Sequence, residues 1–132
     1  MSGFGLPPTP AVLRSYRLSR YAAGPLAVRI GRRPAGLPPG WERRDVVLLS
    51  AANPGGARRP DGWNARMMRT LAVRLRRHPV LSGEGRLGTW SEPLVAAAMP
   101  AAAAIVLARR YRQNAVVLLR GDRPARLLLL VS

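Results

Sequence analysis

The chain has 132 residues, of which 48% are hydrophobic, so it is long enough for one globular domain and too short for two ordinary ones. It has no cysteine, which excludes disulfides and thiolate metal sites, and its single histidine, His78, excludes a two-histidine metal motif or mechanism within one chain. The 22 basic residues are all arginine and outnumber 6 acidic ones, which gives a formal net charge of +16.

A charge of this size indicates a nucleic-acid or acidic partner. However, the chain is also rich in Ala, Gly and Pro, whose codons, like most codons for Arg, are GC-rich, so genome base composition would produce the same charge. The arginines are spread along the whole sequence rather than gathered in a tail. We therefore expect a non-specific basic surface that makes nucleic acid a possible partner.

The first residues lack the basic and then apolar pattern of a signal peptide. Residues 94–108 carry no charge, but they are interrupted by Pro100 and fall short of the roughly 20 apolar residues that span a bilayer. The sequence predicts a soluble, cytoplasmic protein with no membrane partner.

Residues 1–24 are rich in Pro, Gly and Arg and are predicted to form an irregular N-terminal arm, which Tyr16 and Tyr21 would attach to the body. Residues 25–132 are predicted to form a single α+β domain. Within it, residues 26–30 alternate between apolar and other side chains, which is typical of a half-buried edge strand. A loop follows at residues 31–44, with Trp41 as its apolar anchor.

Residues 46–51 are a continuous apolar run and predict a central strand, ended by Asn53-Pro54-Gly55-Gly56. Asp61 is a suitable N-cap for a helix that continues to about residue 77, where His78-Pro79 stops it. A short strand at residues 80–81, a loop at residues 82–88 and a strand at residues 94–98 follow.

Pro100 suits the first turn of a second helix, which is predicted to end near residue 112. Strands at residues 115–119 and 127–131 complete the chain. The middle six elements have the order βαββαβ, which predicts a ferredoxin-like core with an extra strand at each end. We expect a mostly antiparallel sheet with two helices on one face.

At about 100° per residue, the apolar side chains of the first helix share one face, and its arginines share the other. The arginines on the outer face are Arg66, Arg69, Arg76 and Arg77. Asn64 falls in the middle of the apolar face, where an amide without partners costs roughly 1–3 kcal/mol. Asn64 is therefore either a structural amide bonded to the neighbouring loop or a residue that lines a pocket.

Several polar residues lie where strands and helices end, and we expect them near one end of the sheet. The candidate ligand-binding residues are Asn53, Asn64, Trp90, Glu92, Gln113 and Asn114. Glu92 enters an apolar strand and needs a donor, which Asn64 or Arg66 could supply. As alternatives, Trp90 fills the core and Asn114 is a left-handed helix cap.

Glu84 and Glu92 are candidate catalytic residues, as a carboxylate pair for acid–base chemistry or for a hard cation. They could equally be counter-ions of neighbouring arginines. The sequence has no P-loop, dinucleotide-binding fingerprint or serine nucleophile elbow. It therefore indicates no cofactor and no metal site, and it leaves open whether the protein is an enzyme.

Five short motifs occur in one order along the chain. They are AANP at residues 51–54, NAR at 64–66 with Arg69 one helical turn further on, GEG at 83–85, WSEP at 90–93 and LARRYRQNA at 107–115. This order resembles the short bacterial proteins of the domain of unknown function family DUF3293, over about residues 25–131. The family has no established activity, so the resemblance implies no reaction.

The resemblance does imply that certain polar positions belong to a shared pattern, namely Asn53, Asn64, Glu84, Trp90, Glu92, Gln113 and Asn114. Two positions depart from that pattern. Trp63 stands where relatives usually carry Glu, and Leu94 stands where they commonly carry a small hydroxyl residue. Both changes remove groups that acid–base chemistry would use.

Three hypotheses follow from the sequence. In the first, the chain is a binding module with a polar pocket at one end of the sheet, and its partner is a small polar or anionic ligand. In the second, it is an RNA- or DNA-associated protein that uses the arginine-rich helix face. In the third, it is a small hydrolase that uses the two glutamates.

Overall fold

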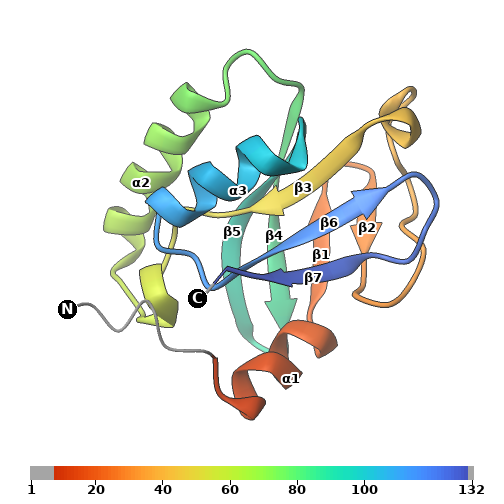
Figure 1. Ribbon diagram of the computed structural model, residues 1–132. Helices are drawn as coiled ribbons and strands as arrows, with labels where there is room; N and C mark the ends of the chain where they lie inside the picture. The colour runs from red at the N-terminus through yellow and green to blue at the C-terminus, as the bar shows by residue number, and fades with distance from the viewer. Residues whose placement is uncertain (1–7, 131–132) are drawn as a thin grey trace.

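A curled antiparallel sheet of seven strands, with three α-helices, makes up the part of the chain that the computed structural model describes, residues 8–130 (Figure 1). The helices are α1 (Pro10–Leu18), α2 (Asp61–Arg74) and α3 (Ala101–Arg110). The strands are β1 (Arg20–Ala23), β2 (Leu26–Val28), β3 (Asp45–Leu49), β4 (Val80–Leu87), β5 (Trp90–Ala98), β6 (Ala115–Arg120) and β7 (Arg126–Leu129). Their order in the sheet is β2-β1-β4-β5-β3-β6-β7.

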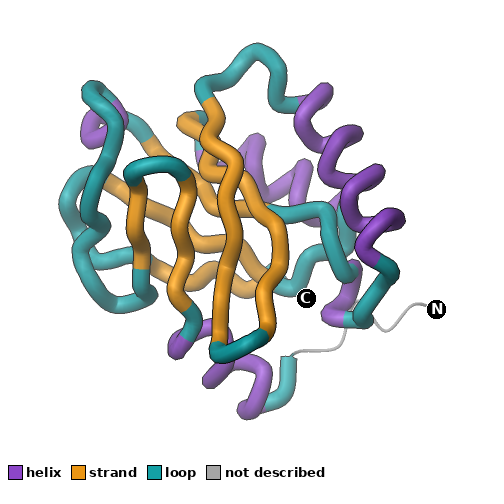
Figure 2. The backbone as a smooth tube through the Cα atoms, turned by 180° about the vertical axis from the view of Figure 1, so that it is seen from behind, coloured by secondary structure: helices purple, strands orange, loops and turns teal. Residues whose placement is uncertain are grey.

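The curl of the sheet brings its two edges together. Ile30, just after β2, forms a bridge with Ala125, just before β7, and the Gly31 amide donates to the Ala125 carbonyl at 2.8 Å. The strands thus wrap around one of the two faces of the sheet, as the reverse view in Figure 2 shows.

Each face of the sheet has its own apolar core, because side chains alternate along the strands. Val47 of β3 and Val95 of β5 point toward α2 and α3, which contribute Leu71 and Ala104 to this core. The neighbouring strand residues point into the curl, where β1, β2 and Trp41 cover them. Helices α2 and α3 therefore lie on one face, and the chain's own edge strands close the other (Figures 1 and 2).

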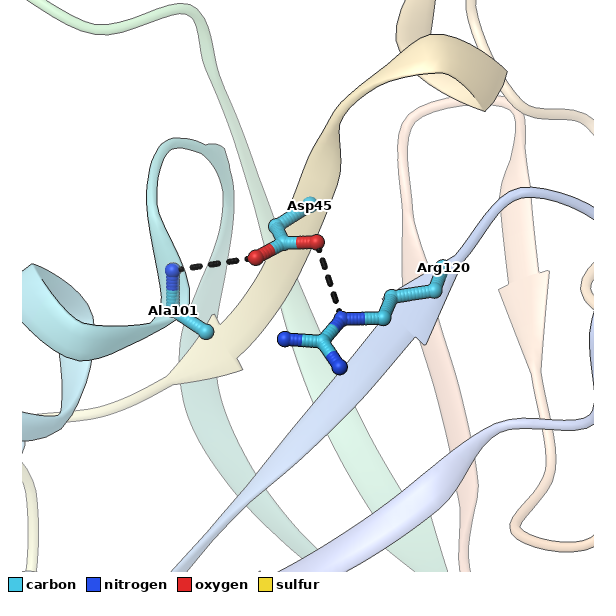
Figure 3. Close-up of polar contacts among 3 residues, drawn as sticks. All are labelled: Asp45, Ala101 and Arg120. Atoms are coloured by element: carbon cyan, nitrogen blue, oxygen red, sulfur yellow. Dashed lines mark hydrogen bonds and ion pairs between the residues drawn. The ribbon is translucent and has the colours of Figure 1, made fainter.

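Asp45 connects three elements at the start of β3 (Figure 3). Its Oδ2 accepts from the Ala101 backbone N–H at 3.3 Å, and its Oδ1 accepts from Arg120 Nε at 3.0 Å. Ala101 is the first residue of α3, whose N-cap, Pro100, makes no side-chain capping bond. A carboxylate from a neighbouring strand thus satisfies a free amide at this helix N-terminus.

The predicted irregular N-terminal arm is wrong for residues 10–23, which form α1 and β1; residues 1–7 lie outside the described part. Thr9 caps α1, with its Oγ1 accepting from the Val12 amide at 3.3 Å, and Pro10 is the first helical residue. Both are ordinary helix-start signals. The chain therefore has two strands, and not one, before the βαββαβ segment.

The predicted loop at residues 82–88 is also wrong, because β4 extends to Leu87 and pairs with both β1 and β5. Gly83 makes the pairing with β1 possible, since a Cβ there would clash with the Ala22 carbonyl oxygen. Gly83 and Gly85 thus allow close approach of two strands and do not mark a turn, whereas Gly88, with φ of 61°, lies in the turn between β4 and β5.

The two predicted helices end earlier than expected. Helix α2 ends at Arg74, so Arg76 and Arg77 follow it in a turn. Helix α3 ends at Arg110, and Arg112 beyond it takes a left-handed conformation. Among residues 8–130, no helix has both the length and the apolar character needed to cross a membrane.

Candidate functional site

Asn64 lies in the first turn of α2 with 6% of its surface exposed, so the predicted inward amide is confirmed. Its Oδ1 accepts from the Asn53 backbone N–H at 3.0 Å. Its Nδ2 donates to Asn53 Oδ1 at 2.9 Å and to the Arg59 carbonyl at 3.3 Å. The amide is therefore paired at both ends, and it fixes Asn53 from two sides.

Asn53 follows β3 in a left-handed conformation, with φ of 47°. Asn tolerates this conformation better than most residues because its short side chain bonds locally. Its Oδ1 also accepts from the Arg59 amide at 2.9 Å, and its Nδ2 donates to Glu92 Oε1 at 2.9 Å. We call Asn53, Asn64 and Glu92 the amide–carboxyl cluster.

Glu92 lies near the start of β5, and burial raises the pKa of its carboxyl to about 7, although the hydrogen bond from Asn53 acts in the opposite direction. Burial disfavours the charged form because the carboxylate loses its hydration. Both the protonated and the ionised form of this carboxyl are thus accessible near neutral pH. Its donor is Asn53, and not Asn64 or Arg66 as predicted.

A cavity of about 420 Å³ opens beside Glu92. Residues of α1, namely Val12, Ser15 and Tyr16, are among its lining, so the segment predicted to be an irregular arm forms one of its walls. Figure 1 shows α1 beside one end of the sheet. The polar lining of the cavity includes Tyr16, Tyr21, Asn53, Arg58, Glu92, Gln113 and Asn114. Its apolar lining includes Val12, Leu48, Leu94 and Leu127.

Two tyrosines on the wall remain protonated at neutral pH. Burial raises the pKa of Tyr21 to about 12, and its hydroxyl donates to the Tyr16 carbonyl at 2.9 Å. The pKa of Tyr16 is also raised, first by burial and then by the charge of Glu92, while a hydrogen bond from Asn114 lowers it. The sequence predicted these tyrosines only as anchors of the N-terminal arm.

Gln113 and Asn114 reach the cavity from the turn after α3. Gln113 is buried, and its Nε2 donates to the carbonyls of Ala52 and Tyr111 at 2.9 and 3.2 Å. Asn114 Nδ2 contacts the Tyr16 hydroxyl at 3.4 Å. The left-handed residue of this turn is Arg112, so the alternative role of Asn114 as the left-handed cap is wrong.

The register of β4 and β5 separates the two candidate glutamates. Glu92 pairs with Gly85, whereas Glu84 pairs with Pro93, the residue that follows Glu92. Directly paired residues share a face and neighbours along a strand do not, so Glu84 and Glu92 point to opposite faces. They cannot act as a carboxylate pair, and Glu84 instead lies 3.9 Å from Arg86 Nε.

Trp90 is 41% exposed, so the interpretation that it fills the core is wrong. It lines the cavity and also a second groove of about 550 Å³ between the start of α2 and β5. The residues that line both are Asn53, Arg58 and Trp90. Of the four arginines predicted as a helix face, all are exposed but only Arg69 lines this groove.

Metal ligands are not gathered in the described residues: no group of three or more His, Asp or Glu side chains there could hold an ion. The polar side chains of the site include amides, hydroxyls, the carboxyl of Glu92 and the guanidinium of Arg58. Such an arrangement can bind polar groups and hold or release one proton near neutral pH.

Residues 8–130 thus form an α+β fold with a polar cavity at one end of the sheet. The model of the family "Protein of unknown function (DUF3293)" matches residues 49–116, more than half of the chain, and the chain belongs to that family. The predicted resemblance is thus confirmed, over a shorter stretch than residues 25–131. No curated protein and no solved structure matches the chain.

Proposed function

We propose that the chain is a binding module whose cavity takes a small polar ligand with a hydrogen-bond donor directed at Glu92. The observation that carries this proposal is the state of the Glu92 carboxyl. Asn53 occupies its Oε1, and no group among residues 8–130 donates to its Oε2. A half-buried carboxyl oxygen beside a cavity is a ready acceptor for a ligand N–H or O–H.

The lining indicates the rest of the ligand. Apart from Glu92 and Arg58, the polar lining side chains are neutral amides and hydroxyls. A donor group of the ligand would therefore face Glu92, and any acidic group would lie toward Arg58. Leu94 and Leu127 supply apolar contact for its hydrocarbon part.

The size of the cavity supports a small molecule. Sites for such ligands have volumes of roughly 300–1,000 Å³ and combine apolar walls with a few polar groups. The cavity, at about 420 Å³, is at the lower end of this range. A metabolite-sized molecule fits it and a polymer does not.

The test is a screen of primary amides, alkylamines, polyols and amino acids by thermal shift and by NMR of the side-chain amides. Binders should shift the amide signals of Asn53 and Asn114 and raise the melting temperature. Glu92→Gln should abolish both effects, whereas Glu84→Gln, which removes the same charge on the opposite face, should leave them intact. Binding that survives Glu92→Gln, or a screen without binders, would refute the proposal.

The proposal includes the fold of the binding module. The strands of the βαββαβ segment have the order β4-β5-β3-β6, with α2 and α3 as connections. This arrangement supports a ferredoxin-like unit that β1, β2 and β7 extend at its edges.

A further inference from the structure

We infer that the groove between the start of α2 and β5 binds single-stranded nucleic acid, with phosphates on its arginines and a base on Trp90. This site is separate from the cavity of Glu92, although Asn53, Arg58 and Trp90 border both. We call it the arginine–tryptophan groove, defined by Arg58, Arg59, Arg69 and Trp90.

The groove has a surplus of positive charge. Three arginines line it against one carboxylate, that of Asp61. All three arginines are exposed, and none of them forms an ion pair with a carboxylate among residues 8–130. Guanidinium groups without a protein partner are suited to phosphate oxygens, which they contact through two parallel hydrogen bonds.

Trp90 gives the groove an aromatic surface. Its side chain is 41% exposed, and Met68 and Pro93 add apolar lining nearby. The Arg59 guanidinium lies 5.5 Å from the centre of the ring of Trp63, a residue outside the groove lining, and this contact orients the long arginine side chain. Exposed aromatic rings beside arginines are the pattern that binds single strands, because any unpaired base can stack on them.

Binding in the groove depends on the position of its arginines and not on the net charge of +16, which is spread over the whole chain. It also differs from the predicted helix face. Arg76 and Arg77 follow the end of α2, and Arg66 does not line the groove. A duplex would not use Trp90, since its base faces are already stacked inside the helix.

The test is fluorescence anisotropy with a labelled oligothymidine of about ten nucleotides, which matches the range of single-strand site sizes. Arg58, Arg59 and Arg69 are changed together to Gln. The control is the triple change of Arg32, Arg33 and Arg123 to Gln, because these residues are also exposed and lie outside the groove. Both variants lose three charges, so they differ only in position.

The groove variant should bind at least tenfold more weakly than the control variant. Between about 50 and 200 mM salt, the logarithm of the association constant falls linearly with the logarithm of the salt concentration. For the groove variant this slope should be less steep than for the unchanged protein by about 2, because three phosphate contacts are lost. Equal affinities of the two variants would reduce the binding to net charge and overturn the inference.

Trp90 supplies a second, independent test. Trp90→Ala should weaken oligothymidine binding on the order of tenfold, whereas Trp90→Phe, which keeps an aromatic face, should retain most of it. Circular dichroism checks that each variant keeps its fold. Unchanged affinity in Trp90→Ala, or tighter binding of a hairpin duplex than of the single strand, would also overturn the inference.

Discussion

Asn53 and Glu92 are 39 residues apart in the chain, and their side chains meet through a hydrogen bond of 2.9 Å. Because Asn53 is also bonded to Asn64, one turn residue connects the end of β3, the start of α2 and the start of β5. The position of the carboxyl in the cavity therefore depends on Asn53 and, through it, on Asn64, which does not line the cavity.

Glu92 should make stability fall as the pH rises. Its pKa is about 7 in the folded protein against an ordinary 4.5, so the folded state keeps a proton that the unfolded chain loses between these values. The free energy of unfolding therefore decreases across this window. Above it, the full penalty is on the order of 3–4 kcal/mol, at about 1.4 kcal/mol per pKa unit.

Glu92→Gln removes this penalty. Urea unfolding should show the variant gaining stability over the unchanged protein at about pH 8 but not at about pH 4, below both pKa values. Glu84→Gln is the matched control, since it removes a carboxyl from the opposite face. A stability difference for Glu92→Gln that is the same at both pH values would contradict the prediction.

Asn64→Leu should destabilise the fold by about 2–4 kcal/mol, because the Asn53 amide and the Arg59 carbonyl lose their partner. Chemical denaturation measures this loss. Asn114→Leu is a suitable comparison, because the one side-chain hydrogen bond of Asn114 among the described residues is long, at 3.4 Å. Similar losses of unfolding free energy in the two variants would show that the amide–carboxyl cluster does not stabilise the fold more than the single long hydrogen bond of Asn114 does.

Gly83→Ala should weaken the pairing of β1 with β4, since the new methyl group would collide with the Ala22 carbonyl and with Ala23. We expect a loss of about 1–3 kcal/mol or more, as in other overpacked sites. Faster tryptic cleavage at Arg17 and Arg20 would follow the release of β1.

Gly62→Ala is the control for that change. Gly62 lies in α2 with open space around its Cα, so a methyl group there should raise stability by about 0.5–1 kcal/mol. Thermal melts compare the two variants. If Gly83→Ala melted as high as Gly62→Ala, the close approach of β1 would not require glycine.

Helix α1 should exchange its amide hydrogens faster than α3. None of the nine residues of α1 is buried, whereas Ala101, Ala104 and Ala108 of α3 are. Low burial favours local opening. Tyr21→Phe should speed exchange in α1 further, because it removes the hydrogen bond to the Tyr16 carbonyl. Hydrogen-exchange mass spectrometry that found α1 as protected as α3 would contradict this.

Periodicity predicted the parts of the fold that have long, regular patterns. The apolar run of β3 and the helical face around Asn64 were both identified, and Asn64 led to the amide–carboxyl cluster. The partners of Asn64 were predicted only as a group near one end of the sheet. Which atom bonds which depends on the left-handed turn at Asn53, and no local pattern specifies that turn.

Other parts were obscured by glycine and proline. Gly83 and Gly85 prevented the prediction of β4 over its full length, because glycine has no side chain and so does not show the alternation of apolar and polar residues in a strand. With that strand recognised, a two-residue turn at Gly88 and Thr89 would have given the register that places Glu84 and Glu92 on opposite faces. Thr9 and Pro10 did signal the start of α1, but the Pro- and Arg-rich composition around them favoured an irregular arm.

The cavity is lined by residues from inside and from outside the stretch that the family model matches. The amide–carboxyl cluster lies within residues 49–116, the stretch that the family model matches, whereas α1 and β1, which carry Tyr16 and Tyr21, lie before it. A relative with a different N-terminal segment would present the same acceptor inside a differently shaped enclosure. Under the proposed function, the shape of the cavity would thus depend on a segment outside the stretch that the family model matches, whereas the carboxyl is held from within that stretch.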